Sequence, residues 1–200
     1  MKVYFAPASR AVRTVWLLEE IGQPYELERF TLGQKEMRGP DYARINPNGR
    51  VPTLVDGDVT ISESTAIAQY LGAKYAPNLT PGPNDANFAM FLQWLHYGEG
   101  MIMPPINNYV VETILLPPER RNDEIAARAL KLLNRTLKAV ESHMQGRAFL
   151  AGDFTIADTI TGHAVIMSRR LRADFSNCPN LAGYADRLES RPAFKAAEAA

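Results

Sequence analysis

Asn46-Pro47-Asn48-Gly49-Arg50-Val51-Pro52-Thr53-Leu54 joins a run of turn-forming residues directly to a short β-rich segment. Pro52 stands where that strand begins, and a proline there cannot donate a ladder hydrogen bond. Two interpretations stay open. The proline is trans and starts an edge strand, or the Val51–Pro52 bond is cis and turns the N–H and C=O of Val51 toward a ligand backbone.

The residues around this stretch have a mixed α/β pattern. Short β-rich runs cover Val3 and Phe5, 24–30, 53–55 and 59–61, and the last two flank an Asp-Gly turn at 56–58. Apolar residues at helical spacing predict a helix over 10–21 that ends at Gly22, and another that follows Ser62-Glu63-Ser64-Thr65. With a short irregular helix near 40–45, the predicted order is β-α-β, helix, β-β-α.

The chain changes character near residue 80. The segment 76–84 holds three prolines and a glycine, which neither a helix nor an inner strand tolerates. Beyond it the pattern is amphipathic and helical over 85–98, 118–144, 155–171 and 180–190. We therefore predict an α/β domain over 1–76, a linker over 77–84 and an all-helical domain over 85–200.

Composition narrows the function. The 200 residues carry 22 basic and 22 acidic side chains, which argues against a nucleic-acid or membrane partner. The single cysteine, Cys178, excludes an intramolecular disulfide and a multi-cysteine zinc site, and three scattered histidines form no metal-ligand pattern. The first ten residues are too short an apolar run for a secretory signal, so we expect a cytoplasmic protein.

A second informative motif is Ile61-Ser62-Glu63-Ser64-Thr65-Ala66-Ile67, where a strand end runs into a helix start. Free N–H groups and a serine hydroxyl at such a point can bind a carboxylate, while Glu63 can accept an ammonium group. Together they would suit the head group of an α-amino acid. The alternative is that Ser62 or Ser64 simply caps the helix.

In order and spacing, these two motifs resemble those of the cytosolic glutathione transferases, and the resemblance covers essentially the whole chain. Its details are closer to bacterial, theta- or nu-like members than to the beta class. The resemblance implies an α/β thioredoxin-like N-terminal domain plus an all-α C-terminal helical domain. It also implies a cis Val51–Pro52 bond, pairing of the Val51 backbone with the cysteinyl part of glutathione, and binding of the γ-glutamyl group by Glu63 and Ser64. Outer contacts would come from Gln34 or Lys35 and from Asn48 to Arg50.

Chemistry on glutathione requires a donor near its sulfur, because a free thiol titrates near ~8.5 and the thiolate is the nucleophile. In the family this donor is a tyrosine, serine or cysteine after the first strand. Alignment of the Ser-Arg-Ala-Val run places Ala6 there, which has no hydroxyl. Ser9 and Arg10 are the remaining candidates, with a plain helix cap and an exposed surface residue as the respective alternatives.

The second domain supplies two further predictions. Trp94, Tyr97 and Met101 belong to an aromatic and methionine-rich stretch that would bind an apolar electrophile between the domains, unless these side chains are ordinary helix core. In the segment 150–158, which resembles the buried capping element of these transferases, Thr155 and Asp158 have the spacing of a reciprocal helix cap. We assign that pair to folding.

The resulting prediction is a glutathione transferase that conjugates the glutathione thiolate to small hydrophobic electrophiles, with glutathione-dependent peroxide or disulfide reduction as a further activity. Glutathione is the cosubstrate and no cofactor is expected. The resemblance also implies a homodimer formed through the helices that begin near Glu63 and Asp85. One alternative is a non-catalytic ligand-binding or protein-interaction module of the same fold, which Ala6 supports. Another is a glutathione-dependent isomerase or dehalogenase.

Overall fold

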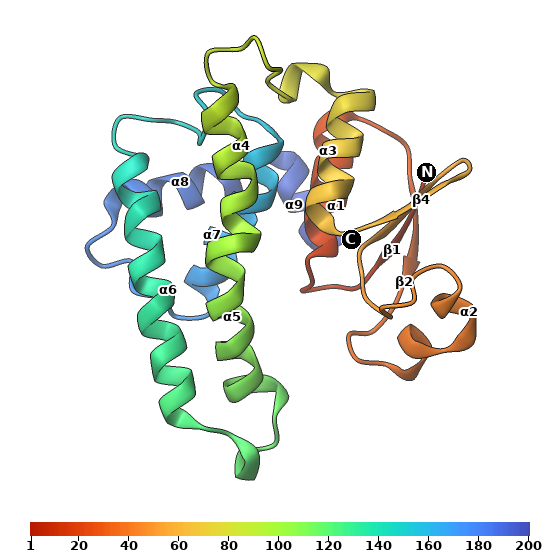
Figure 1. Ribbon diagram of the computed structural model, residues 1–200, viewed down its shortest axis with the longest axis horizontal. Coiled ribbons are helices and arrows are strands. Elements are labelled where there is room, and N and C mark those ends of the chain that lie inside the picture. The colour runs from red at the N-terminus through yellow and green to blue at the C-terminus, as the bar shows by residue number, and fades with distance from the viewer. The chain divides into compact units, whose positions relative to one another are not determined.

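The computed structural model describes residues 1–200, which fall into two compact units (Figure 1). The first unit comprises Met1–Thr80 together with Ser190–Ala200, and the second comprises Pro81–Glu189. The chain therefore returns to its first unit at the C-terminal end.

The first unit is built on a four-stranded sheet with the order β2-β1-β3-β4. Its strands are β1 (Lys2–Phe5), β2 (Glu26–Arg29), β3 (Thr53–Asp56) and β4 (Val59–Ser62). β2 is parallel to β1, whereas β3 is antiparallel to both β1 and β4. Val3 and Leu54 face each other at the centre and are fully buried. All four strands were predicted from the β-rich runs.

Helices α1 (Ala11–Ile21) and α3 (Ser64–Tyr75) pack against each other in this unit. α1 ends as predicted at Gly22, whose φ of 63° is the left-handed conformation that glycine adopts without strain. Between β2 and β3 lie two short helical segments, η1 (Lys35–Arg38) and α2 (Pro40–Ala43). A further single turn, η2 (Pro77–Leu79), lies in the proline-rich segment that was predicted to be a linker.

Helix α9 (Pro192–Ala199) packs along α1, which differs from the predicted single helical domain over 85–200. The rings of Trp16 and Phe194 meet edge to face with centroids 4.9 Å apart. Arg191 donates from Nε and Nη2 to the two carboxylate oxygens of Glu20 over 2.5 and 2.7 Å. These contacts fasten the C-terminal segment to the first unit.

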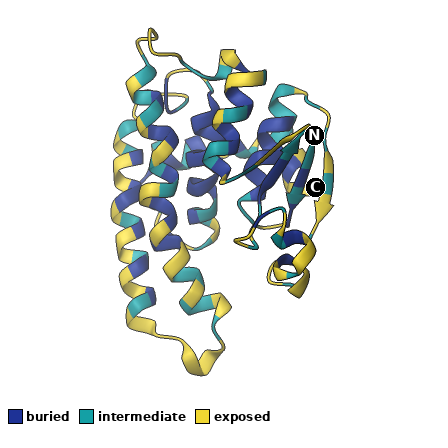
Figure 2. Ribbon diagram, turned by 45° about the vertical axis from the view of Figure 1, so that its right-hand side comes forward, coloured by how far each residue is buried: buried dark blue, intermediate teal, exposed yellow.

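The second unit consists of helices. They are α4 (Phe88–Tyr97), η3 (Gly98–Ile102), α5 (Met103–Val110), η4 (Val111–Leu115), η5 (Pro118–Arg120), α6 (Asp123–His143), η6 (Asp158–Gly162), α7 (His163–Arg170) and α8 (Pro179–Glu189). Figure 2 shows that α6 buries one side and exposes the other. Its buried side carries Ala129, Leu133, Leu137 and Val140, as expected for the amphipathic helix predicted within 118–144. None of the helices is long and apolar enough to cross a membrane.

The sequence predicted that the first helix of this unit ends near Gly98, but the helix does not end there. It continues through the π-helical turn η3 into α5 and η4 and reaches Leu115. The glycines at 98 and 100 and the prolines at 104 and 105 resemble helix breakers. Pro104 and Pro105 lie just after η3, at the junction where the π-helical turn passes into α5.

Asp158 is the buried polar centre of the second unit. Its carboxylate accepts hydrogen bonds from Thr155 N (2.9 Å), Leu150 N (3.1 Å) and the Tyr184 hydroxyl (2.7 Å). The predicted cap is thus half reciprocal, because the Thr155 hydroxyl accepts from Ala157 N instead of Asp158 N. Burial raises the pKa of Asp158 to about 6 against the opposing effect of these donors.

Candidate functional site

The loop before β3 presents a backbone segment that the rest of the chain leaves unbonded. The Val51–Pro52 peptide is cis, in agreement with the expectation from the family resemblance. No hydrogen bond joins the N–H or C=O of Val51 to another part of the chain. Pro52 is buried and Val51 is half-buried, so this edge can pair with an extended ligand backbone.

Buried polar side chains hold this loop in place. The carbonyl of Arg50 accepts from the Tyr42 hydroxyl over 2.6 Å and from Asn46 Nδ2 over 2.9 Å. Thr53 Oγ1 lies 2.9 Å from the same hydroxyl and 3.0 Å from the same amide nitrogen. Burial raises the pKa of Tyr42, so its hydroxyl keeps the proton that it donates.

The turn at 46–50 lies close against η1. Asn46 Oδ1 accepts from Asn48 N over 3.0 Å, and Gly49 has a φ of 58°. A Cβ at Gly49 would come within 2.7 Å of the Met37 carbonyl, so the position needs glycine for space as well as conformation. Gln34 stands just before η1 and accepts from Thr31 N over 2.7 Å, while the Arg50 side chain is exposed.

The β4–α3 turn places a carboxylate beside a helix start. Glu63 is exposed and has a φ of 73°, which is rare outside glycine. Neither Ser62 nor Ser64 caps α3, so the helix begins without a side-chain cap. Ser64 Oγ instead accepts from Nη1 of Arg13 on α1 over 3.1 Å, and both side chains are buried. The first-turn N–H groups of α3 can therefore receive an anion.

Sheet topology brings these segments together. β3 pairs antiparallel with β1 and β4, with Thr53 opposite Tyr4 and Ser62. The start of β3 therefore lies at the same end of the sheet as the ends of β1 and β4. We refer to this end as the edge of the sheet. Val51, Glu63 and the β1–α1 loop meet along that edge, which gives a backbone pair, a carboxylate and a helix start to a single ligand.

Ser9 and Arg10 lie in the β1–α1 loop at this edge. The Ser9 hydroxyl donates to the Ala6 carbonyl over 2.7 Å and accepts from Ala11 N over 3.0 Å. Its proton is thus engaged, and it reaches a ligand sulfur only by leaving Ala6. Arg10 is half-buried and holds the backbone position before α1.

The residues predicted to contact an electrophile have different environments in the second unit. Trp94 is only 3% exposed and packs against Tyr97 and His143 with centroids 4.7 and 4.3 Å away, so it belongs to the helical core. The Tyr97 hydroxyl donates to the Thr136 carbonyl over 3.1 Å. Met101 is 50% exposed and lies in η3.

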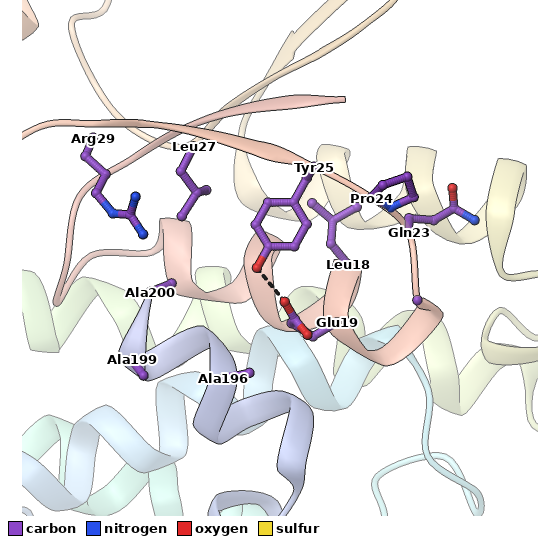
Figure 3. A pocket seen from close by; sticks show the side chains of 11 residues that line it. Leu18, Glu19, Gln23, Pro24, Tyr25, Leu27, Arg29, Ala196, Ala199 and Ala200 are labelled. Carbon is purple, nitrogen blue, oxygen red and sulfur yellow. Dashed lines mark hydrogen bonds between the residues drawn. The ribbon is translucent and has the colours of Figure 1, made fainter.

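A cavity of about 760 Å³ elsewhere in the first unit contains none of the predicted site residues (Figure 3). It lies between α1, β2 and α9, and the Tyr25 hydroxyl donates to Glu19 within it over 2.5 Å. Burial and the Glu19 carboxylate raise the pKa of Tyr25 to about 12. Across residues 1–200, no group of three or more His, Cys, Asp or Glu side chains could hold a metal ion.

The sequence did not identify the residues that support the site from beneath. Tyr42, Asn46 and Thr53 hold the Val51 loop, and Arg13 contacts Ser64. Arg13 did leave one signal in the sequence, because it is the one charged residue in the run 11–18 of the predicted helix. A buried arginine requires a polar partner.

Residues from both units match known protein families. Residues 1–73 fit the family model "Glutathione S-transferase, N-terminal domain", and residues 102–192 fit "Glutathione S-transferase, C-terminal domain". Glutathione S-transferase 4 of Zea mays is 32% identical over 96% of this chain and 89% of its own length. Glutathione S-transferase 3 of Zea mays is 30% identical over 100% of this chain and 94% of its own.

Solved structures agree in fold over nearly the full length. The theta class glutathione S-transferase of Xanthomonas axonopodis pv. citri, with glutathione bound, superposes with a TM-score of 0.89 at 25% identity, covering 100% of this chain and 97% of that one. A glutathione transferase of Methylococcus capsulatus gives a TM-score of 0.85 at 28% identity, covering 99% and 97%.

Proposed function

This chain belongs to the glutathione S-transferase family, and from that premise we propose that it conjugates the thiolate of glutathione to hydrophobic electrophiles. The observation that carries the proposal is the unbonded Val51 backbone at the same sheet edge as Glu63 and the start of α3. A tripeptide laid along that edge meets a partner for its backbone, its ammonium group and its carboxylate.

We place the three parts of glutathione as follows. The Val51 N–H and C=O pair with the cysteinyl residue, beside Pro52. Glu63 accepts the γ-glutamyl ammonium group, while the Ser64 hydroxyl and the first N–H groups of α3 donate to its carboxylate. Gln34 and Arg50 are outer contacts for the remaining carboxylate, with Lys35 and Asn48 as neighbours.

Hydrogen-bond donors in the β1–α1 loop then stabilise the glutathione thiolate, and the thiol proton leaves to solvent. Ser9 fills this role by redirecting its hydroxyl hydrogen bond from the Ala6 carbonyl to the sulfur, or Arg10 fills it with a charged donor. The thiolate attacks an electrophilic carbon, a carbon–sulfur bond forms, and the leaving group departs with the electron pair. Positioning and thiolate stabilisation supply the rate without a covalent enzyme intermediate.

The remaining assignments follow the resemblance. We propose that Tyr97 and Met101 contact the electrophile, with Trp94 supporting the Tyr97 ring from the core. We propose a homodimer through the helices that begin near Glu63 and Asp85, and a bacterial, theta- or nu-like class, which the Xanthomonas structure supports. The single thiol, at Cys178, is typical of a reducing compartment such as the cytoplasm.

Two measurements test the activity. The protein should be retained on immobilised glutathione, and it should conjugate glutathione to 1-chloro-2,4-dinitrobenzene faster than the uncatalysed reaction. Organic hydroperoxides and mixed disulfides then test the reductive activity. Retention without turnover of any of these substrates would favour a module that only holds ligands, and failure to bind glutathione would refute the proposal.

A further inference from the structure

An aromatic cavity of about 480 Å³ lies on the outer face of the first unit's sheet. Successive side chains of a strand point to opposite faces, so Tyr4 faces away from the buried Val3 and Phe5. Along β2, Leu27 and Arg29 point toward α1 and α9 (Figure 3), which leaves Glu28 and the following Phe30 on the outer side. Residues of α2 form another wall of the same cavity.

Three aromatic rings form its wall. The centroid of Tyr42 lies 5.0 Å from that of Tyr4 and 4.8 Å from that of Phe30, and the Tyr4 and Phe30 rings stack at 6.2 Å. Tyr42 is buried, whereas Tyr4 and Phe30 are half-buried. Aromatic faces carry negative electrostatic potential, and a cation within about 6 Å of a ring centroid is attracted to them.

The rim of the cavity is acidic. Glu28, Glu36 and Asp41 line it, and no lysine or arginine does. Asp41 lies 3.3 Å from Arg44, but both of these side chains are largely exposed, and Glu36 forms no ion pair. Ring faces together with carboxylates favour a positively charged ligand with an apolar surface.

The chain already holds an ammonium group against one side of this wall. Lys2 Nζ lies 5.2 Å from the Tyr4 ring centroid and 2.8 Å from Glu28 Oε2. The two side chains are 40% and 49% exposed, and an exposed ion pair contributes at most about 1 kcal/mol. An external cation can therefore displace Lys2 from both partners at little cost.

We propose that this cavity binds a small organic cation, a quaternary or alkylated ammonium, against the rings of Tyr4, Phe30 and Tyr42. Such a ligand gains from the ring faces without needing a hydrogen bond to each of its substituents. A strongly hydrated inorganic cation gains less, because it must give up water to contact carbon. The site is separate from the edge where Val51 and Glu63 lie.

Tyr42 connects this cavity to the glutathione edge, the sheet edge with Val51 and Glu63 where we propose that glutathione binds. Its ring belongs to the cavity wall, while its hydroxyl donates to the Arg50 carbonyl over 2.6 Å, directly before Val51. A cation that holds the Tyr42 ring therefore also holds the Val51 loop. Occupancy of the cavity should alter glutathione affinity, and glutathione should alter cation affinity by the same factor. Only this linkage rests on the proposed function.

The test uses choline as the probe and its neutral carbon analogue, 3,3-dimethyl-1-butanol, as the matched ligand. Calorimetry or chemical-shift titration of the full chain should show saturable choline binding that is at least about tenfold tighter than that of the alcohol. Tyr4→Leu should weaken choline binding about fivefold or more, and Glu36→Gln should weaken it to a smaller extent.

Lys2→Met gives the sharpest result. It removes the internal ammonium from Tyr4 and Glu28, so choline should bind more tightly than to the original chain. Asp58→Asn, in the exposed β3–β4 turn, is the matched control and should leave choline binding unchanged.

Three outcomes would overturn the site: no choline binding to the original chain and to Lys2→Met, equal affinity for choline and the alcohol, or a choline affinity that neither rises in Lys2→Met nor falls in Glu36→Gln. Because Lys2 and Glu36 are at the surface, these results do not depend on the stability of the Tyr4 variant. Choline binding by a protein that ignores glutathione would refute the proposed function and leave the cation site standing.

Discussion

Arg13 of α1 donates a hydrogen bond to Ser64 at the start of α3 over 3.1 Å, and both side chains are buried. The residues are 51 positions apart in sequence, so the bond ties the two helices together behind the glutathione edge. An arginine that occupies one lone pair of the Ser64 oxygen leaves the serine proton free to donate elsewhere. That donor direction is what a ligand carboxylate requires.

Ser64→Ala is therefore expected to weaken glutathione binding by about 1–3 kcal/mol, because a hydrogen bond to a charged group is lost. Titration calorimetry measures the change directly. Ser62→Ala is the matched control, since Ser62 stands two residues earlier at the end of β4 and should leave binding unaltered. Equal effects of the two substitutions would remove Ser64 from the site.

Two substitutions at Glu63 can separate an effect on glutathione binding from an effect on the free energy of unfolding. Its φ of 73° strains any residue with a Cβ. Glu63→Gly should raise the free energy of unfolding by about 1 kcal/mol and weaken glutathione binding by about 1–3 kcal/mol. Glu63→Ala should weaken binding equally without the gain in stability. Urea unfolding and calorimetry provide the two readouts, and unaltered binding in both variants would move the ammonium contact to another residue.

The role of Ser9 is tested through the ionisation of bound glutathione. Ser9→Ala should raise the pH at which the bound thiol ionises by about one unit or more, because the thiolate loses a hydrogen-bond donor. Thiolate ultraviolet absorbance followed against pH measures it. Arg10→Gln is the companion variant. If Ser9→Ala leaves the titration unchanged and Arg10→Gln shifts it, the role belongs to Arg10.

Local patterns were enough to point to the segments that we propose as the glutathione-binding site. Proline at the start of β3 and the strand-to-helix junction at Glu63 each carry a constraint that is visible within a few residues of sequence. Strand pairing then places them at one edge, as the register of Thr53 with Ser62 illustrates. The strands themselves are short but end at clear turn residues such as Gly57.

The supporting residues could not be predicted in the same way. Tyr42 looks like an ordinary residue of a short helix, and only the fold brings its hydroxyl to the Arg50 carbonyl. Helix α9 has eight residues, which is too short for a periodic signal, and its place on α1 depends on the contact between Phe194 and Trp16. Gly98 was predicted to end a helix because glycine often follows the last helical residue. The structure shows a different reason for the glycine, since a Cβ there would lie 2.8 Å from Thr161 Oγ1.

Acid should weaken the first unit through Asp56. Its Oδ2 accepts from Tyr70 (2.8 Å), Lys74 (2.8 Å) and Tyr75 (2.5 Å), and hydrogen bonding, first of all from Lys74, lowers the pKa of Asp56 to about 2. A carboxyl whose pKa is lower in the folded state stabilises the protein above the unfolded pKa of about 3.9. That stabilisation is lost as pH falls from about 4 to about 2.

Asp56→Asn should therefore cost about 1 kcal/mol at neutral pH, a value limited by the exposure of Lys74, and its difference from the original chain should shrink across that acid window. Urea unfolding at several pH values measures it. Asp58→Asn, two residues away and exposed, serves as the control. A difference that persists below about pH 2 would assign the effect to shape and not to charge.

Gly98 and Gly100 form a matched pair within the π-helical turn η3. A Cβ at Gly98 would lie 2.8 Å from Oγ1 and 3.0 Å from Cα of Thr161, whereas a Cβ at Gly100 would meet nothing within 4 Å. Gly98 N also donates to Thr161 Oγ1 over 2.8 Å, so the two segments cannot separate without losing that bond. Gly98→Ala should therefore destabilise the chain by about 1–3 kcal/mol through overpacking. Gly100→Ala should stabilise it by about 0.5–1 kcal/mol, because alanine has the higher helix propensity. Thermal or urea unfolding of the two variants decides the matter, and equal shifts of the same sign would mean that η3 is not held against η6 as described.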